Sequence, residues 1–329
     1  MKTLITILAC ISSIASAQTI VHSPKPPVVI KKGTVDVDLC ETTPFVFKGK
    51  MYRLEWERPA PKDFMTGSGC LRIVEHGTQV VVSRFGQKQR FPCAYVEGDT
   101  VYVVGVNESA KWCGDTLTLF TSKDLVHWES RTIFSDPRFR ICNTSICKTS
   151  DGYMMSFEIH EGSPGGIGFF SGRFLKSKDL MNWTLLPEEH RITLGGTAIS
   201  PHCLRFCDGW YYVFSTVGGY PTGWVLLLHR SRDLKTWEPC PSNPVMIAEE
   251  PDKQIANPKL TEEQRDRIAK AQNRDNSDID FCEFKGKLII NYCWGNQAGS
   301  EFIAEAEYAC SEAQYLKGWF PKAHTNTGK

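Results

Sequence analysis

The heptapeptide Ser122-Lys123-Asp124-Leu125-Val126-His127-Trp128 has two close copies later in the chain. The copies are Ser177-Lys178-Asp179-Leu180-Met181-Asn182-Trp183 and Ser231-Arg232-Asp233-Leu234-Lys235-Thr236-Trp237. The three aspartates are spaced 55 and 54 positions apart. Self-similarity at such a fixed period indicates a repeat architecture, in which each copy belongs to one structural unit. We expect each Asp to hold a turn between outer strands and each Trp to pack between neighbouring units.

A second motif, a glycine turn followed by a β-rich run, occurs five times. The five glycines are Gly49, Gly98, Gly152, Gly209 and Gly286. In the second, third and fourth copies the heptapeptide Asp follows the glycine by 26, 27 and 24 residues, so the two motifs keep phase. A short apolar run also precedes each glycine, and such a pair of runs is typical of a hairpin. Five units of about 50–57 residues have the size of four-stranded blades. The sequence therefore predicts an all-β fold, a five-bladed β-propeller.

The interval between the fourth and fifth glycines is longer than the others by roughly 20 residues. Thr261-Glu262-Glu263-Gln264 has the pattern of a helix capping box, and polar residues follow it. We expect an inserted surface helix at about 261–274. The fifth unit ends in a weakened copy of the heptapeptide, from Ser311-Glu312 to Trp319.

The N-terminus has the features of a secretory signal. A basic start is followed by the apolar stretch Leu4 to Ile14 and by Ala15-Ser16-Ala17. We expect a signal peptide at 1–17, an N-terminal segment at 18–35, the propeller at 36–320 and a C-terminal tail at 321–329. The segment from Ile20 to Ile30 is expected to supply a strand that closes the ring against blade five, since an open propeller leaves unpaired edges. The protein is expected to be secreted or periplasmic, with no membrane span, because the apolar stretch is shorter than the ~20 residues that cross a bilayer.

Composition excludes several classes of protein. The 329 residues are 41% hydrophobic with a net charge of +1, which excludes a disordered chain and gives no support for nucleic-acid or anionic-membrane binding. Of the 13 cysteines, Cys10 falls in the signal peptide. The other 12 leave two interpretations open, namely disulfides of an exported protein or small buried side chains. No Cys-x-x-Cys or His-Glu-x-x-His pattern occurs, so we predict no metal and no cofactor.

The repeated Ser-Lys/Arg-Asp-Leu-x-x-Trp motif and the five hairpins resemble the five-bladed β-propeller glycosidases, the superfamily around glycoside hydrolase families 43, 32, 62, 68 and 130. The resemblance covers residues 36–320. It implies a glycosidase with an Asp starting blade one, an Asp starting blade three and a Glu starting blade four. In this chain the matching positions hold Glu41, Asn143-Thr144-Ser145 and Ser200-Pro201-His202, so two of the three acidic positions are not acidic.

Carboxyl groups for glycoside hydrolysis are expected at other positions, because the reaction needs one protonated and one ionised acid. Asp278 and Asp280 begin the first strand of blade five, and period-two alternation places them on one face. An alternative is that acids here only pair with arginines of the inserted helix. Glu41 matches the family's blade-one acid, and Glu158 follows a strand of blade three. We predict Asp278, Glu41, Glu158 and Asp280 as catalytic residues, with Asp278 and Glu41 facing each other where blades one and five meet.

Substrate-binding residues are expected at the same mouth of the ring. Arg90, Asn143 and His202 start blades two, three and four, and they offer groups that bind hydroxyls or a carboxylate, although ion pairs with the site's acids would also explain the charged ones. Trp294 combines an apolar ring with neighbouring amides, which suits sugar recognition.

The leading interpretation is an exported monomeric glycosidase acting on an oligosaccharide or polysaccharide. Two alternatives keep the fold: a glycoside phosphorylase with a phosphate pocket at Arg90, Arg140 and His202, and a non-catalytic carbohydrate-binding propeller, which the missing family acids favour.

Overall fold

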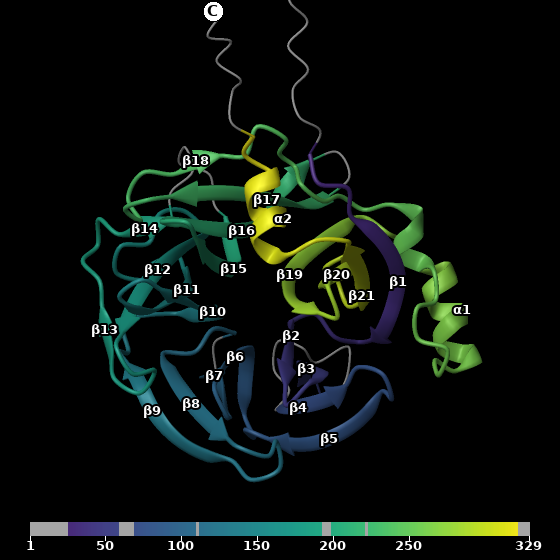
Figure 1. Cartoon of the computed structure of the whole chain (residues 1–329), viewed down its shortest axis with the longest axis horizontal. Coiled ribbons are helices and arrows are strands. Elements are labelled where there is room, and N and C mark those ends of the chain that lie inside the picture. The colour runs from purple at the N-terminus through teal and green to yellow at the C-terminus, as the bar shows by residue number, and fades with distance from the viewer. Residues whose placement is uncertain (1–25, 59–68, 110–111, 193–198, 221–222, 322–329) are drawn as a thin grey trace, which may run out of the picture.

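The computed structural model describes residues 26–58, 69–109, 112–192, 199–220 and 223–321. Its strands form five sheets around a common axis, as Figure 1 shows. The predicted all-β, five-bladed propeller is confirmed. The proposed signal peptide and the last eight residues of the chain lie outside the described residues.

The first three blades follow one another along the chain. Blade one contains β2 (Thr42–Phe47), β3 (Lys50–Glu57), β4 (Cys70–Glu75) and β5 (Val80–Phe85). Blade two contains β6 (Gln89–Glu97), β7 (Thr100–Asn107), β8 (Thr116–Ser122) and β9 (Glu129–Ser135). Blade three contains β10 (Ile141–Thr149), β11 (Gly152–His160), β12 (Phe170–Ser177), β13 (Trp183–Leu185) and β14 (Arg191–Ile192).

The last two blades complete the ring. Blade four contains β15 (Ser200–Cys207), β16 (Trp210–Tyr220), β17 (Gly223–Ser231) and β18 (Glu238–Pro239). Blade five contains β19 (Asp275–Phe284), β20 (Lys287–Gly295) and β21 (Glu301–Tyr308), and its outermost strand is β1 (Ile30–Val37). The innermost strands β2, β6, β10, β15 and β19 contact one another in turn and surround the axis.

The two repeated motifs have the structural roles expected of them. Four of the five motif glycines lie in the turns between the two inner strands of a blade, and Gly152 is the first residue of β11, directly after its turn. All five have positive φ, which glycine adopts without steric cost. The Asp124 carboxylate accepts hydrogen bonds from the backbone amides of Val126 and His127, both at 2.8 Å. The corresponding Asp residues of the other two copies make the same pair of bonds. The turn prediction is confirmed.

The core consists of layers between blades. The motif residue Trp128 of blade two stacks on Phe85 of blade one with 3.9 Å between ring centroids, and Trp237 of blade four stacks on Phe174 of blade three. Large hydrophobic clusters fill the interfaces between blades one and two, two and three, three and four, and four and five. Apolar burial between successive blades therefore stabilises most of the ring.

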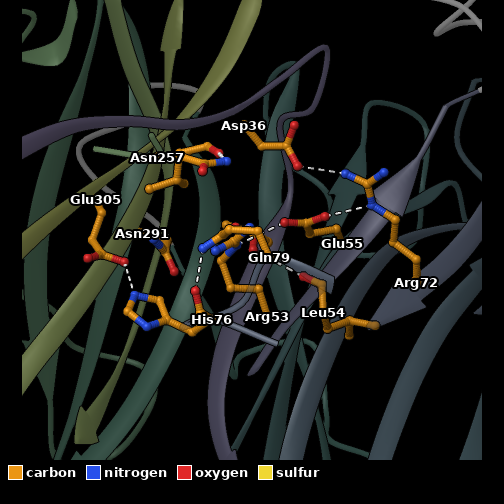
Figure 2. A network of polar contacts seen from close by, with 12 residues as sticks. Asp36, Arg53, Leu54, Glu55, Arg72, His76, Gln79, Asn257, Asn291 and Glu305 are labelled. Carbon is orange, nitrogen blue, oxygen red and sulfur yellow. Dashed lines mark hydrogen bonds and ion pairs between the residues drawn. The ribbon is translucent and has the colours of Figure 1, made fainter. Parts of the chain in front are cut away.

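The interface between blades one and five, which we call the closure seam, is polar instead. Figure 2 shows its central contacts, in which Arg72 of β4 bonds both Glu55 of β3 (2.7 Å) and Asp36 of β1 (2.8 Å). Nearby, His76 lies 2.7 Å from Glu305 of β21. The strand β1 pairs antiparallel with β21, and Figure 1 shows it beside that strand. Blade five is thus completed by a strand from the start of the described chain, which runs over Ile30–Val37. Of the segment from Ile20 to Ile30 that was expected to supply this strand, residues 20–25 lie outside the described residues.

Helical elements are few. Helix α1 (Glu262–Lys270) begins at the expected capping box, in which Thr261 and Gln264 bond each other's backbone amides. A 3₁₀ turn, η2 (Glu250–Lys253), packs against β1. The weakened fifth copy of the heptapeptide forms helix α2 (Glu312–Gly318) instead of a turn, because Ser311 caps a helix there. No helix in the described part of the chain is both long and apolar enough to cross a bilayer.

The cysteines include both a disulfide and small buried side chains, so each interpretation holds for some of them. Cys113 and Cys142 form a disulfide that joins the β7–β8 connection to β10. The other described cysteines are free, and Cys93, Cys147, Cys203 and Cys293 are among those that are buried.

Candidate active site

The inner strands of blades two to five each contain a register shift near one end of the axis. The shifts lie between Arg90 and Cys93, Ile141 and Thr144, Pro201 and Cys203, and Ser277 and Asp280. A β-bulge adds one residue to a strand and re-aims a side chain. In blades three, four and five the bulges contain Asn143, His202 and Asp278, and all three side chains line one cavity.

This cavity has a volume of about 420 Å³ and two kinds of wall. Aromatic rings form one part of it, contributed by Trp56, Phe91, Trp112, Phe169, Phe170 and Trp224. Polar and charged groups form the other part, contributed by Glu41, Arg58, Arg140, Asn143, Glu158, His160, Ser200, His202, Asp278 and Glu301. Apolar rings beside a few convergent polar groups are typical of small-molecule sites.

Glu41 and Asp278 lie side by side where blades one and five meet. A carboxylate oxygen of each and the sulfur of Cys40 all lie within 4.8 Å of one another. The Cys40 thiol donates to Asp278 at 3.1 Å, and Arg58 donates to Glu41 at 3.2 Å. The two carboxylates thus form a close acid pair, each of them bonded by a donor from blade one or from the segment before it.

The two acids of this pair have opposite pKa shifts. Burial raises the pKa of Glu41 to about 7, against the opposing effect of Arg58. Burial also acts to raise the pKa of Asp278, but the charge and hydrogen bond of His202 outweigh it and lower that pKa. At neutral pH Asp278 is therefore the ionised member of the pair.

Glu158 is a third buried acid of the cavity and lies on β11 of blade three. The Ser200 hydroxyl donates to it, and the Asn143 amide nitrogen lies 3.3 Å from its Oε2. The side chain is 1% exposed, and burial raises its pKa to about 7, more than the neighbouring His202 and these hydrogen bonds lower it. Glu158 therefore holds its proton over most of the pH range below neutrality.

His202 connects the two groups of acids. Its Nδ1 lies 2.9 Å from Asp278 Oδ1 and 3.0 Å from the amide nitrogen of Asn143. Burial acts to lower the pKa of His202, but Asp278 and Glu158 outweigh it and raise that pKa. A proton on Nδ1 that is donated to ionised Asp278 fits this charge distribution.

Of the eight predicted site residues, five line the cavity: Glu41, Asn143, Glu158, His202 and Asp278. The expected contact between blades one and five at Glu41 and Asp278 is present. Asp280 does not line this cavity, because the bulge between Ser277 and Asp280 interrupts the alternation of the strand. It lines a small adjoining pocket, where its carboxylate pairs with Arg205, so the placement of Asp280 in the cavity is corrected.

Arg90 and Trp294 also lie outside the cavity lining. Arg90 is 1% exposed and bonds Glu108 at 2.9 Å, so it serves the structure of blade two. Trp294 is fully buried, where its indole nitrogen donates to Thr34 at 2.9 Å and its ring stacks on Phe302. Neither side chain is placed to contact a ligand in the cavity.

Two charged residues of the cavity were not singled out by the sequence. Arg58 bonds both Glu41 and Glu301, and thereby joins blades one and five at the site. Glu301 stands opposite Gly295 in the β20–β21 ladder. The sequence predicts the strand that ends near Gly295. Pairing the next strand with it in an antiparallel hairpin would have placed Glu301 at the same mouth of the ring.

No protein-family model and no curated protein matches the chain. Solved structures do match. A structure named "Glycoside hydrolase" shares 12% identity, with a TM-score of 0.60 over 90% of this chain and 96% of that one. A thermostable family-43 glycoside hydrolase gives 10% identity and a TM-score of 0.60, covering 85% and 92%. An exo-1,5-alpha-L-arabinanase from a bovine ruminal metagenomic library gives 11% and 0.51, covering 83% and 93%. At these identities the matches establish the fold, and the resemblance to propeller glycosidases is confirmed at that level.

Proposed function

We propose that the protein is a glycoside hydrolase that cleaves glycosidic bonds in oligosaccharides or polysaccharides by paired-carboxylate catalysis. One observation carries this proposal. A single buried cavity holds Glu158, whose pKa is raised to about 7, and Asp278, whose pKa is lowered. Two carboxyl groups whose environments separate their pKa values are what an acid and a base for glycoside cleavage require.

Glu158 is the proposed general acid. In its protonated form it donates a proton to the glycosidic oxygen as the bond from that oxygen to the anomeric carbon breaks. Ser200 and Asn143 fix its carboxyl group, so the proton is held in one direction. If Asp278 acts as a base, it takes the proton of the attacking water, and Glu158 is protonated again from solvent. If Asp278 instead attacks the anomeric carbon, the ionised Glu158 takes the proton of the water that breaks the glycosyl–Asp278 ester and is thereby protonated again.

Asp278 is the proposed base or nucleophile. Its ionised carboxylate either takes a proton from water or attacks the anomeric carbon directly, and His202 compensates its charge in both cases. Glu41, bonded by Arg58, is a second acid with a carboxylate oxygen within 4.8 Å of one of Asp278, and its raised pKa leaves Asp278 as the member of the pair that is ionised first. Stereochemistry of the product, measured by NMR during turnover, distinguishes the two routes.

The aromatic walls support a saccharide as the ligand. Trp56, Trp112 and Trp224 present ring surface and indole groups next to the polar residues, which suits the apolar faces and hydroxyls of a sugar. The solved propellers with the same fold include enzymes named as glycosidases, which agrees with this ligand class.

A carbohydrate-binding propeller without activity is the second candidate. It is favoured by Asn143 and His202, which stand at positions where the resembling family has acids. The phosphorylase alternative receives less support, because Arg90 of its expected phosphate pocket pairs with Glu108 outside the cavity.

The test is release of reducing ends from a broad panel of plant, algal and microbial glycans, with and without phosphate. We expect hydrolysis that does not depend on phosphate and that is lost in Asp278→Asn. Glu161→Gln, which changes an exposed carboxylate directly after β11, is the control and keeps full activity. Binding of a glycan without release of any product would overturn the hydrolase proposal in favour of the binder.

We further propose that the protein is exported. The expected signal peptide motivates this proposal, and the Cys113–Cys142 disulfide supports it, since disulfides persist in oxidising compartments. Fractionation of the native host should find the mature chain, starting near Gln18, outside the cytoplasm. A cytoplasmic chain retaining Met1 would contradict it.

A further inference from the structure

Arg140 and His160 occupy one corner of the cavity, at the blade-three side. Arg140 directly precedes β10, and the His160 amide donates to the Arg140 carbonyl at 2.9 Å. Residues directly opposite each other in an antiparallel pair project to the same face of the sheet. Both side chains accordingly line the cavity, beside Trp112 and Phe170.

The Arg140 guanidinium differs from the other arginines near the site in having no partner within the described residues. Arg58 bonds two glutamates, and Arg173 donates to two backbone carbonyls. The described contacts of Arg140 are made by its backbone, to Ser163 and His160, and its Nε is buried without an acceptor. Arg140 as a whole is partly exposed, so its guanidinium can meet a ligand in the cavity, and a charged donor without an acceptor is a strong receptor for an anion.

Two further donors in the same corner have no acceptor in the described part of the chain. The indole nitrogen of Trp112 and Nδ1 of His160 are both buried and unpartnered, and His160 as a whole is only 6% exposed. The two rings contact each other edge to face, with centroids 6.1 Å apart. Buried polar atoms in folded proteins nearly always have a partner, so three unsatisfied nitrogens in one corner of a cavity point to a ligand that accepts hydrogen bonds.

We infer that this corner is a carboxylate-binding subsite and that the substrate is an acidic saccharide carrying a uronate group. The inference rests on the proposed function and adds the substrate class to it. The planar guanidinium fork of Arg140 matches the two oxygens of a carboxylate, and Trp112 and His160 donate to the same group. A single negative charge at this corner is balanced by Arg140, while the acids Glu41, Asp278 and Glu301 lie at the other side of the cavity with Arg58.

The test compares acidic oligosaccharides with neutral versions of themselves. Oligogalacturonides and glucuronoxylan oligosaccharides are titrated calorimetrically into the intact protein, each beside its carboxyl-reduced counterpart and beside a sulfated neutral oligosaccharide. We expect at least one acidic probe to bind 10-fold or more tighter than its reduced counterpart, and this preference to weaken as salt rises. Arg140→Gln should abolish the preference while leaving the affinity for the reduced probe within 2-fold, and Arg140→Lys should retain part of it.

Arg138→Gln is the matched control, because Arg138 lies two residues away, is exposed and pairs with Asp136. It should keep the full preference. Three results would overturn the subsite. The protein could bind acidic and reduced probes equally, it could prefer the sulfated probe, or Arg140→Gln could lose the same affinity for the acidic and the reduced probe. Arg140-dependent binding of an acidic probe that is never cleaved leaves the subsite standing and removes the hydrolase. If the protein cleaves neutral glycans and Arg140→Gln does not affect that cleavage, the hydrolase proposal stands and the carboxylate subsite does not.

Discussion

Asn143 and His202 stand where the resemblance implies acids, and each contacts a carboxylate supplied by another strand. Asn143 approaches Glu158 on β11, and His202 bonds Asp278 on β19. The cavity thus contains three acids, Glu41, Glu158 and Asp278. Only Glu41 stands at a position that the resemblance implies, so matching of motifs alone indicated an incomplete site.

Glu158→Gln tests the proposed acid. We expect kcat to fall on the order of 10² or more, because the amide cannot donate a proton to the leaving oxygen. In the unmodified enzyme kcat/KM should decline as pH rises through about 7, where Glu158 loses its proton. Steady-state rates between pH 5 and 9 on the substrate identified in the glycan panel measure both effects. An unchanged alkaline limb in Glu158→Gln would assign that limb to another group.

Glu158 also makes folding stability depend on pH. Its folded-state pKa of about 7 lies above its ordinary value of 4.5, so the unfolded state ionises first and is favoured as pH rises from about 4.5 to about 7. Relative to the unmodified protein, Glu158→Gln should therefore gain about 3 kcal/mol of stability between pH 4 and pH 8. Urea unfolding at the two pH values measures this gain. If the stability difference between the two proteins is the same at both pH values, the pKa of Glu158 is not raised in the folded protein.

At the scale of single elements, the Asp-Leu-x-x-Trp turn is the most regular feature of the molecule. The Asp179 carboxylate accepts two backbone amides and the Asn182 side chain, and these bonds lower its pKa to about 2. Asp179→Ala should cost about 1 kcal/mol or somewhat more, because two turn amides lose their acceptor. Thermal unfolding measures the loss. Asp151→Ala, which removes only an exposed pair with Lys178, is the control and should change stability little.

Elements were easier to predict from the sequence than the bulges within them. Turn glycines and alternating apolar runs are local signals, so the five hairpins could be located. The bulge between Ser277 and Asp280 has no such signal, and Asp278 adopts a positive φ of 48° there. Strict alternation therefore placed Asp280 beside Asp278, whereas one extra residue turns Asp280 toward Arg205. Arg58 and Glu301 could not be paired from sequence because they lie in different blades.

At the scale of the whole molecule, the closure seam differs from the four apolar interfaces. Glu55 is fully buried there and bonds two arginines, Arg53 at 2.9 Å and Arg72 at 2.7 Å. Glu55→Gln should cost about 3–5 kcal/mol, since it leaves the buried Arg53 without its counter-charge. Urea unfolding monitored by tryptophan fluorescence measures this loss.

Glu57→Gln is the matched control for the seam. Glu57 is partly exposed and bonds Arg72 and Arg84, so its loss should cost less than about 1 kcal/mol. If the two variants were equally stable, the buried carboxylate of Glu55 would contribute no more to stability than the partly exposed one of Glu57.

The arrangement of β1 also determines when the ring can close during synthesis. Thr34 pairs with Ala304, so one of the first strands to leave the ribosome pairs with one of the last. The four apolar interfaces join consecutive blades and can form as each blade emerges. The strand β1 has no partner in its sheet until β21 has been made. Contacts between such distant parts of a chain form slowly. The nascent propeller therefore spends most of its synthesis as an open ring, with an unpaired edge on β1 that chaperones or other chains can reach.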